Sequence, residues 1–537
     1  MRMRFKSLVG GLLLIVGFVC GCSKPGVQEV ATSPDDSGAV SRIHWVGKKT
    51  IAKDPMGTNF YSIWSMPESY RVETQTVDRL ASAPWRLLQG QDQVTNPACA
   101  LLRPLIQDLV DCESFVEFRA QTNGFSELAL AVRVDEERAR VWETNLVQAL
   151  ISLTGADTVL SANKAGWSIK AGNIPDLFEF GRSKGWVVVG MAEGTNRLFG
   201  GLLSRVSGGR KLAANTNNWL DADVQVDELM GIFRGGQMST TNLPRLIVQF
   251  MGEGETVHTR VEATFPQPLG IELDDWNVPT NLIAPELLGF TAVRGVRPWL
   301  ASRKWWNDWQ LGVPPNQIFY WSAWGQPMES YMAVPLTDAS NFVARAADLL
   351  VGPGNAWLKS LHGIGDFWAS NAKDEVAWRE VPYASPFLRI SRNESNDFVV
   401  CGMTPLGELT TPPPQVLNQL TNLTNLVCYE WEITDPRIGA GFQISQLVRM
   451  ASGRSQLAGE TASSPWIRGI APRLGNYVAV TTLPKPNELL MVSRSYIGMT
   501  ALQLQVLADW LESPQFPVGF YTVLTPPPLH DAGLPVD

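Results

Sequence analysis

The fold is decided by two stretches, Phe115-Val-Glu-Phe-Arg-Ala and Leu128-Ala-Leu-Ala-Val-Arg-Val, together with the helical segment that follows them. Both stretches show the two-residue alternation and β-branched content that are typical of strands. The short connection between them suits antiparallel pairing. The next segment opens at Asp135, which can cap a helix, and stops at Gly155, so we predict an amphipathic helix between these two residues.

The same order of elements recurs later in the chain. Ile318-Phe-Tyr-Trp-Ser-Ala is followed by Tyr331-Met-Ala-Val-Pro-Leu, and a second helical pattern opens at Asp338 and stops at Gly352-Pro353. A repeated succession of this kind, with little residue identity, indicates two copies of one structural unit. We therefore predict that residues of about 95–265 and about 295–500 are related by an internal duplication.

Two further strand patterns extend the parallel. Trp186-Val-Val-Val-Gly corresponds to Phe398-Val-Val-Cys-Gly, and Leu220-Asp-Ala-Asp-Val corresponds to Tyr429-Glu-Trp-Glu-Ile. The spacing from the glycine to the first acid is 31 residues in the first case and 28 in the second. Near-matching spacing in the same order supports the duplication.

These patterns predict an α+β fold with two similar halves, each a largely antiparallel sheet with helices packed on one face. We place the first half at residues 45–275 and the second at 276–524, followed by a disordered Pro-rich tail at 525–537. At about 515 mature residues the chain is too long for a single core. The pattern resembles the uncharacterised domain-of-unknown-function families of bacterial envelope proteins, a resemblance that brings no catalytic residue with it.

The first residues resemble a bacterial lipoprotein signal peptide. Basic residues open the chain, an apolar stretch runs from Leu8 to Val19, and Gly21 precedes Cys22. This stretch is too short to span a bilayer, which takes roughly 20 residues. The resemblance implies cleavage after residue 21 and attachment of a diacylglyceryl group and an acyl chain such as palmitate to Cys22. A cleaved secretory signal that leaves Cys22 as a free thiol is the alternative.

Residues 22–44 are predicted to be a flexible tether because they are rich in Pro, Gly, Ser and Asp. Loss of residues 1–21 removes three basic and no acidic residues, which changes the formal charge from −8 to −11. The overall charge of a chain this acidic gives it no electrostatic reason to bind nucleic acid or an anionic lipid surface. We expect an extracytoplasmic protein anchored to the cell envelope, with the outer membrane favoured by Ser23 where the host has one.

Four cysteines lie beyond the signal region. Pro97 to Val110 reads as a helix, which would hold Cys99 and Cys112 about 20 Å apart, too far for a disulfide. Cys401 and Cys428 both lie in strand-like runs, so a cross-strand disulfide between them is one hypothesis, and two buried free thiols are the other.

No spaced motif for catalysis or metal binding is present, so we predict no catalytic residue, no metal and no cofactor. The acids Asp221 and Asp223 are assigned a structural role. Glu430 and Glu432 share one face of a strand and could in principle act as acid and base on a glycoside. No feature of the sequence favours that chemistry over a structural role.

Tryptophan is abundant, with 20 in the chain and six between Trp299 and Trp324. Trp305 and Trp309 are one helical turn apart and could form a glycan platform, because indole faces stack on sugar rings. Packing between helix and sheet is the interpretation that we favour for them. The sequence thus predicts a lipid-anchored envelope protein, more a non-catalytic binding or scaffold module than an enzyme. A glycan-binding or glycan-hydrolysing protein is the alternative.

Overall fold

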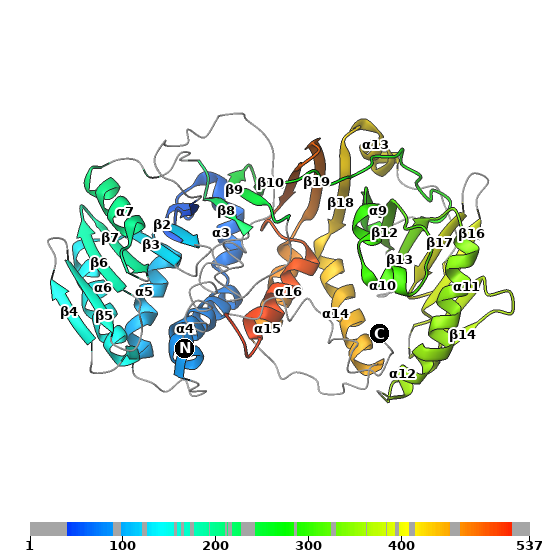
Figure 1. The fold of residues 1–537 in the computed structure, drawn as a ribbon, viewed down its shortest axis with the longest axis horizontal. Helices are drawn as coiled ribbons and strands as arrows, with labels where there is room; N and C mark the ends of the chain where they lie inside the picture. The colour runs from blue at the N-terminus through cyan, green and yellow to red at the C-terminus, as the bar shows by residue number, and fades with distance from the viewer. Residues whose placement is uncertain are drawn as a thin grey trace.

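In the computed structural model, helices lie along a continuous antiparallel sheet that extends across the molecule (Figure 1). The structure describes residues 40–517, apart from 90–97, 121–125, 155–157, 163–165, 172–176, 193, 210–211, 213–216, 227–241, 284–286, 324–328, 361, 383, 393–396, 407–413 and 452–461. The predicted mixture of helices with a largely antiparallel sheet is confirmed. Within the described ranges no helix is both long and apolar enough to cross a bilayer.

The sheet can be followed outward from a central antiparallel pair, β10 (Thr256–Thr264) and β20 (Glu488–Ser495). On the β10 side the order is β9 (Arg245–Glu253), β8 (Leu220–Gln225), β1 (Ser41–Trp45), β2 (Ser114–Ala120), β3 (Ser126–Arg133), β7 (Trp186–Ala192), β6 (Leu177–Ser183), β5 (Gly166–Ala171) and β4 (Thr158–Ala162). On the β20 side the order is β19 (Asn476–Lys485), β18 (Leu426–Ile433), β11 (Leu287–Arg294), β12 (Gln317–Ala323), β13 (Ser330–Pro335), β17 (Asp397–Gly402), β16 (Phe387–Arg392), β15 (Glu375–Arg379) and β14 (Asp366–Ala369).

The helices lie between the strands along the chain. In the first part of the chain they are α2 (Lys48–Ile51), the 3-10 turn η1 (Pro55–Gly57), α3 (Thr58–Trp64), α4 (Pro67–Gln89), α5 (Cys99–Asp111), α6 (Glu136–Thr154) and α7 (Arg197–Ser207). In the second part they are α9 (Arg297–Ala301), α10 (Lys304–Asp308), α11 (Ala339–Leu349), the π turn η2 (Leu350–Gly354), α12 (Asn355–Ser360), α13 (Pro414–Asn422), α14 (Thr434–Ala451), α15 (Ser463–Ile470), the 3-10 turn η3 (Ala471–Arg473) and α16 (Ala501–Glu512).

Both predicted helix starts are confirmed. Asp135 accepts a hydrogen bond from the backbone N–H of Arg138 at 2.8 Å, and Asp338 accepts one from the N–H of Asn341 at 3.2 Å. The predicted stop at Gly352-Pro353 is wrong, because the chain continues through η2 into α12 without leaving the helical region. The π turn accommodates Pro353. Proline has no N–H to donate, and the wider hydrogen-bonded ring of a π turn does not require the regular α-helical hydrogen bond at this position.

Helices cover both faces of the sheet in the first half, which corrects the prediction of one covered face. Val132 of β3 packs in the core beneath α6, while its neighbours Ala129 and Ala131 pack with Leu198 and Leu202 of α7 on the opposite face. These strands carry apolar residues at consecutive positions, so both faces of the sheet must be shielded from water.

One core draws on both of the predicted halves. Ile43 of β1 and Phe60 of α3 share a buried cluster with Ile438 of α14, Ile467 of α15 and Leu504 of α16. The last helices therefore close over strands formed by the beginning of the chain, and in Figure 1 α15 and α16 lie next to α4. Residue 276 does not separate two independent cores.

The tether predicted for residues 22–44 is too long at its C-terminal end. Ser41–Trp45 forms β1, which lies between β2 and β8 inside the sheet. The pattern of this short strand is polar enough to be taken for a linker, and only the two neighbouring strands identify it. Residues 22–39 and the tail at 525–537 lie outside the described residues.

Candidate functional site

A charged groove forms beside α5. One of the residues that line it is the buried carboxylate Asp108. Asp108 lies one turn after the core residue Leu105, on the side of α5 that faces α6, and is itself buried. Burying a carboxylate is costly unless it is paired. Arg138 of α6 supplies the pair with its Nη2 atom 2.7 Å from Oδ2, and the indole N–H of Trp142 donates to the same oxygen at 2.9 Å.

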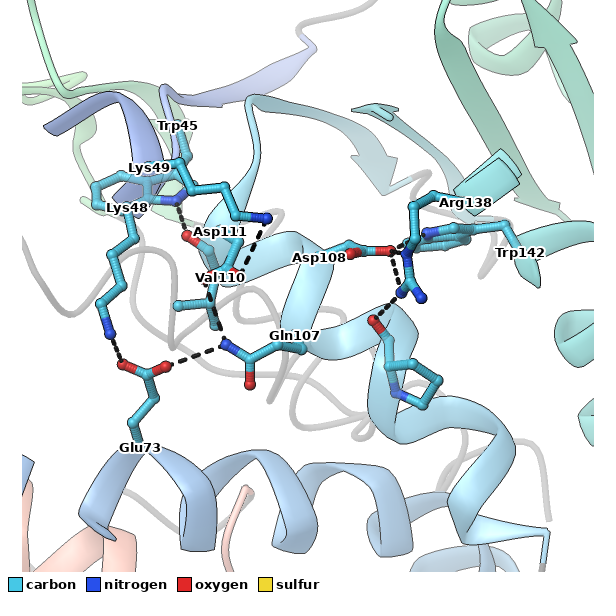
Figure 2. A network of polar contacts seen from close by, with 11 residues as sticks. Trp45, Lys48, Lys49, Glu73, Gln107, Asp108, Val110, Asp111, Arg138 and Trp142 are labelled. Atoms are coloured by element: carbon cyan, nitrogen blue, oxygen red, sulfur yellow. Dashed lines mark hydrogen bonds and ion pairs between the residues drawn. The ribbon is translucent and has the colours of Figure 1, made fainter. Parts of the chain in front are cut away.

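A second carboxylate, Glu73 of α4, is mostly buried and links four helices (Figure 2). Its Oε2 atom lies 2.5 Å from Nζ of Lys48 and accepts the indole N–H of Trp64 at 2.6 Å. Its Oε1 atom accepts the side-chain amide of Gln107 at 3.1 Å. Because both oxygens are occupied, Glu73 serves to hold α2, α3, α4 and α5 together.

The groove has a volume of about 880 Å³, and polar or charged residues make up most of its lining, together with Pro104, Cys112, Val134 and Gly185. It lies where the C-terminal end of α5 meets the start of α6 and the β6–β7 turn. Its cationic lining residues are Lys49, Arg103, Arg133, Arg138 and Lys184, and its acidic ones are Asp108, Asp111, Glu113 and Asp135. Figure 2 shows the Lys49–Asp111 and Arg138–Asp108 pairs that set this alternation of charge.

Glu113 shows how the charges of the groove are fixed. Its Oε1 atom lies 3.3 Å from Nε2 of His44, and its Oε2 atom accepts from Arg133 at 3.1 Å. Burial acts to raise the pKa of Glu113, but the bonds to His44 and Arg133 outweigh burial, so the pKa lies below its ordinary value. The carboxylate stays ionised, and the His44 ring is held flat against Phe115 at a centroid distance of 4.2 Å.

Cys112 is the one thiol among the residues that line the groove. Burial raises the pKa of its thiol, and the nearby ammonium of Lys49 opposes that rise only in part. The reactive form of a cysteine is the thiolate, which a raised pKa disfavours. The chemistry of the groove therefore suits binding of a charged ligand better than covalent catalysis.

Glu430 and Glu432, the acidic pair of the second half, lie on β18, away from the groove. Glu432 of β18 accepts the backbone N–H of Ala501 at 2.7 Å, and its Oε2 atom lies 3.6 Å from Nε of Arg437. Arg437 also donates to the hydroxyls of Tyr320 and Ser322, each at 2.9 Å. Gly289 leaves room for this reach, because a Cβ there would lie 3.4 Å from Nε of Arg437.

Glu430 lies on the same face of β18 as Glu432, but neighbouring groups stabilise its charge less. Burial, followed by the charge of Glu432, raises its pKa to about 7, and Arg437 offsets only part of that rise.

Asp223, one of the two acids singled out in the first half, is paired more closely with a cation. Asp223 is held by both Nε and Nη2 of Arg245, at 2.7 and 2.5 Å, in the structural role expected of it.

The tryptophans divide between core and surface. Trp321 is fully buried and Trp306 is buried, but Trp305 is 40 % exposed and Trp309 is 39 % exposed. The packing interpretation is therefore wrong for Trp305 and Trp309, because α10 turns only Trp306 inward against Phe342 of α11. The rings of Trp305 and Trp309 lie 5.5 Å apart and are inclined by 55°, so they share no flat platform.

The predictions for the two pairs of cysteines have different outcomes. Cys99 and Cys112 lie at the two ends of α5 and are free thiols, as expected. Cys401 and Cys428 are also free, so the disulfide hypothesis is wrong. Their strands, β17 and β18, are separated by β13, β12 and β11, which places the two cysteines about 19 Å apart along the sheet. Cys22 lies outside the described residues.

Comparison with known proteins adds no assignment: no protein-family model, no curated protein and no solved structure matches this chain. Within the described part, no group of three or more His, Cys, Asp or Glu side chains is placed to hold a metal ion.

The groove is not apparent from the sequence patterns. One signal could have found it: Asp108 is a carboxylate on the apolar side of an amphipathic helix, and such a residue requires a cation from elsewhere. The partner, Arg138, is 30 residues away on another helix, and no local pattern connects the two.

Proposed function

We propose that this protein is a lipid-anchored binding or scaffold module of the bacterial cell envelope, attached through Cys22. The groove beside α5 carries the binding part of the proposal. Its alternating charges, held by ion pairs to α6 and to Glu113, are organised before any ligand arrives, which lowers the cost of binding. The ligand that such a groove suits is an extended segment of an envelope partner that carries charges of both signs.

The groove is tested by photo-crosslinking in intact cells. We expect a photoreactive phenylalanine analogue at Lys184, on the exposed rim, to form an adduct with the partner. Arg133→Glu should reduce that adduct by about tenfold, since a reversed rim charge weakens a complementary contact by roughly 1.4 kcal/mol. Arg133 suits the test because its side chain is 68 % exposed, so its loss does little to the fold.

A matched control is Arg140→Glu. Arg140 lies on α6, is just as exposed and is ion-paired with Glu136, but it does not line the groove. The adduct should persist in this variant. Equal loss in the two variants would show that the effect is general electrostatics, and no adduct from Lys184 under any condition would contradict binding at the groove.

The anchor is tested by Cys22→Ser followed by cell fractionation. Without the thiol no thioether lipid can form, so we expect the variant to move from the membrane fraction to the soluble extracytoplasmic fraction. Mass spectrometry of the wild-type N-terminal peptide should reveal the acyl groups. Membrane association that survives the substitution unchanged would remove the anchor from the proposal.

We further propose that the two parts of the chain arose by duplication. The support is the order of pairing outward from β10 and β20: each strand on one side has a counterpart at the same place on the other. β7 pairs with β3 and β6, and β17 pairs with β13 and β16, so the two glycine-containing strands hold equivalent positions. The helical insertions differ more, since α9 and α10 are far shorter than α4 and α5.

Glycan binding is the alternative function, and the exposure of Trp305 and Trp309 favours it. The inclination of the two rings counts against stacking on one flat sugar chain. Hydrolysis is less supported still, because Glu432 already bonds to the α16 N-terminus and to Arg437. A comparison of indole protection by glycan fragments and by vesicles separates a glycan from a bilayer as the ligand of these tryptophans.

A further inference from the structure

Three half-exposed indoles form a patch on the adjoining short helices α9 and α10, which we call the indole patch. It consists of Trp299, Trp305 and Trp309, exposed by 55, 40 and 39 %, and of Val313, exposed by 67 %. The buried neighbour Trp306 donates its indole N–H to the carbonyl of Gly312 at 2.8 Å. The three patch indoles differ from it in facing solvent with both an apolar ring and a polar edge.

Cations border the indole patch. Arg303 lies over the ring of Trp299, with its guanidinium carbon 4.5 Å from the ring centroid. Arg345 of α11 donates to the carbonyl of Trp309 at 3.1 Å and to the side chain of Gln310. The described partners of both arginines are rings, carbonyls and an amide rather than carboxylates. Lys304 and Asp308 of α10 lie 3.9 Å apart as an ion pair and offset each other, so the two arginines leave a locally positive rim around apolar rings in a chain of net charge −8.

That combination matches a bilayer surface. Tryptophan is favoured at the level of lipid headgroups because its ring is apolar and its N–H is polar, and arginine there meets anionic phosphates. Tryptophan and arginine are also enriched at protein–protein interfaces, so the test below uses pure lipid vesicles, on which only a bilayer can protect the indoles. The inclined rings also suit insertion between headgroups, which requires no common plane.

We propose that the indole patch docks into the headgroup region of an anionic bilayer, so that the protein lies against the membrane that carries it. The proposal draws on the anchorage proposed above only to bring that membrane within reach. A lipid at Cys22 limits the distance to the bilayer but leaves the orientation free, whereas a second contact through α9 and α10 fixes which face points away.

The test is hydroxyl-radical footprinting of the full-length protein on vesicles of phosphatidylethanolamine and phosphatidylglycerol. Relative to the vesicle-free protein, oxidation of Trp299, Trp305 and Trp309 should fall by about threefold or more as the indoles enter the headgroup layer. Tyr70 of α4 is the internal control, since it is 62 % exposed and lies in the other half. Its oxidation should not change.

Two variants sharpen the result. Arg303→Gln together with Arg345→Gln should weaken the protection of the indoles, and vesicles of neutral phosphatidylcholine should do the same, because both remove the charge contribution. Unchanged indole oxidation on anionic vesicles, with the protein present in the vesicle fraction, would overturn the proposal. Protection by soluble peptidoglycan fragments without vesicles would overturn it in favour of the glycan alternative.

Failure of this proposal is distinguishable from failure of the anchor. The footprint reports on the indole patch whenever the protein is in the vesicle fraction. Fractionation of Cys22→Ser reports on the anchor alone.

Discussion

Glu430→Gln should stabilise the protein at pH 8 by up to about 3 kcal/mol, since burial raises the pKa of Glu430 to about 7 and each tenfold difference in proton affinity corresponds to about 1.4 kcal/mol. In the unfolded chain the pKa of this carboxyl lies near its ordinary value of 4.5. Between these two values the folded state holds the proton more tightly. Stability is therefore lost as pH rises through this window, and the amide, which cannot ionise, removes that loss.

The measurement is the midpoint of urea unfolding of wild type and variant from pH 4.5 to 8.5. The advantage of the variant should be near zero at the acid end, grow between pH 4.5 and 7, and level off above that range. Glu137→Gln on the exposed side of α6 is the matched control and should show no such growth. An advantage that is constant with pH would mean that Glu430 is not the titrating group.

Arg294→Met should be the most destabilising single change that we predict here, with a loss of roughly 3 kcal/mol, because it removes three hydrogen bonds donated by a buried guanidinium. Arg294 is only 4 % exposed. It donates to the carbonyls of Leu426, Asp274 and Thr424 at 2.6, 2.7 and 2.6 Å, and it lies over the ring of Trp276. One guanidinium thus fastens the connection between the two parts of the chain to β11 and to the start of β18.

Arg297→Met is the control, because Arg297 bonds to the same connecting segment from the surface. It pairs with Glu272 at 3.0 Å and with Asp274 at 3.6 Å, and its side chain is 39 % exposed. A pair of this kind contributes about 0 to 1 kcal/mol. We expect urea unfolding to shift strongly for Arg294→Met and slightly for Arg297→Met. Similar shifts would show that the three hydrogen bonds of Arg294 contribute little to stability.

Single elements of the fold are predictable wherever local physics decides them. The alternation in β2 and β3, the caps at Asp135 and Asp338, and the free thiols at the ends of α5 all follow from residues within one turn or one strand of each other. The strand β1 escapes prediction because its five residues carry too little pattern on their own. The end of α11 escapes prediction because a π turn, which no simple rule predicts, accommodates Pro353.

The candidate sites are less accessible to prediction, since their members come together only in three dimensions. Asp108 can be flagged as a carboxylate on an apolar helix face, but the sequence does not say that Arg138 and Trp142 bind it. The exposure of Trp305 and Trp309 depends on which side of a five-residue helix faces α11. A helix so short has no periodicity from which to read its buried side.

By itself the sequence determined that helices are combined with a largely antiparallel sheet, because alternation and capping act over a few residues at a time. Only the tertiary structure decided that β10 and β20 join the strands into one sheet, that α15 and α16 close over strands from the beginning of the chain, and that Cys401 and Cys428 lie apart. Strand pairing between residues far apart in the chain is set by the shared burial of side chains and by completion of backbone hydrogen bonds. Neither quantity is encoded in a local pattern.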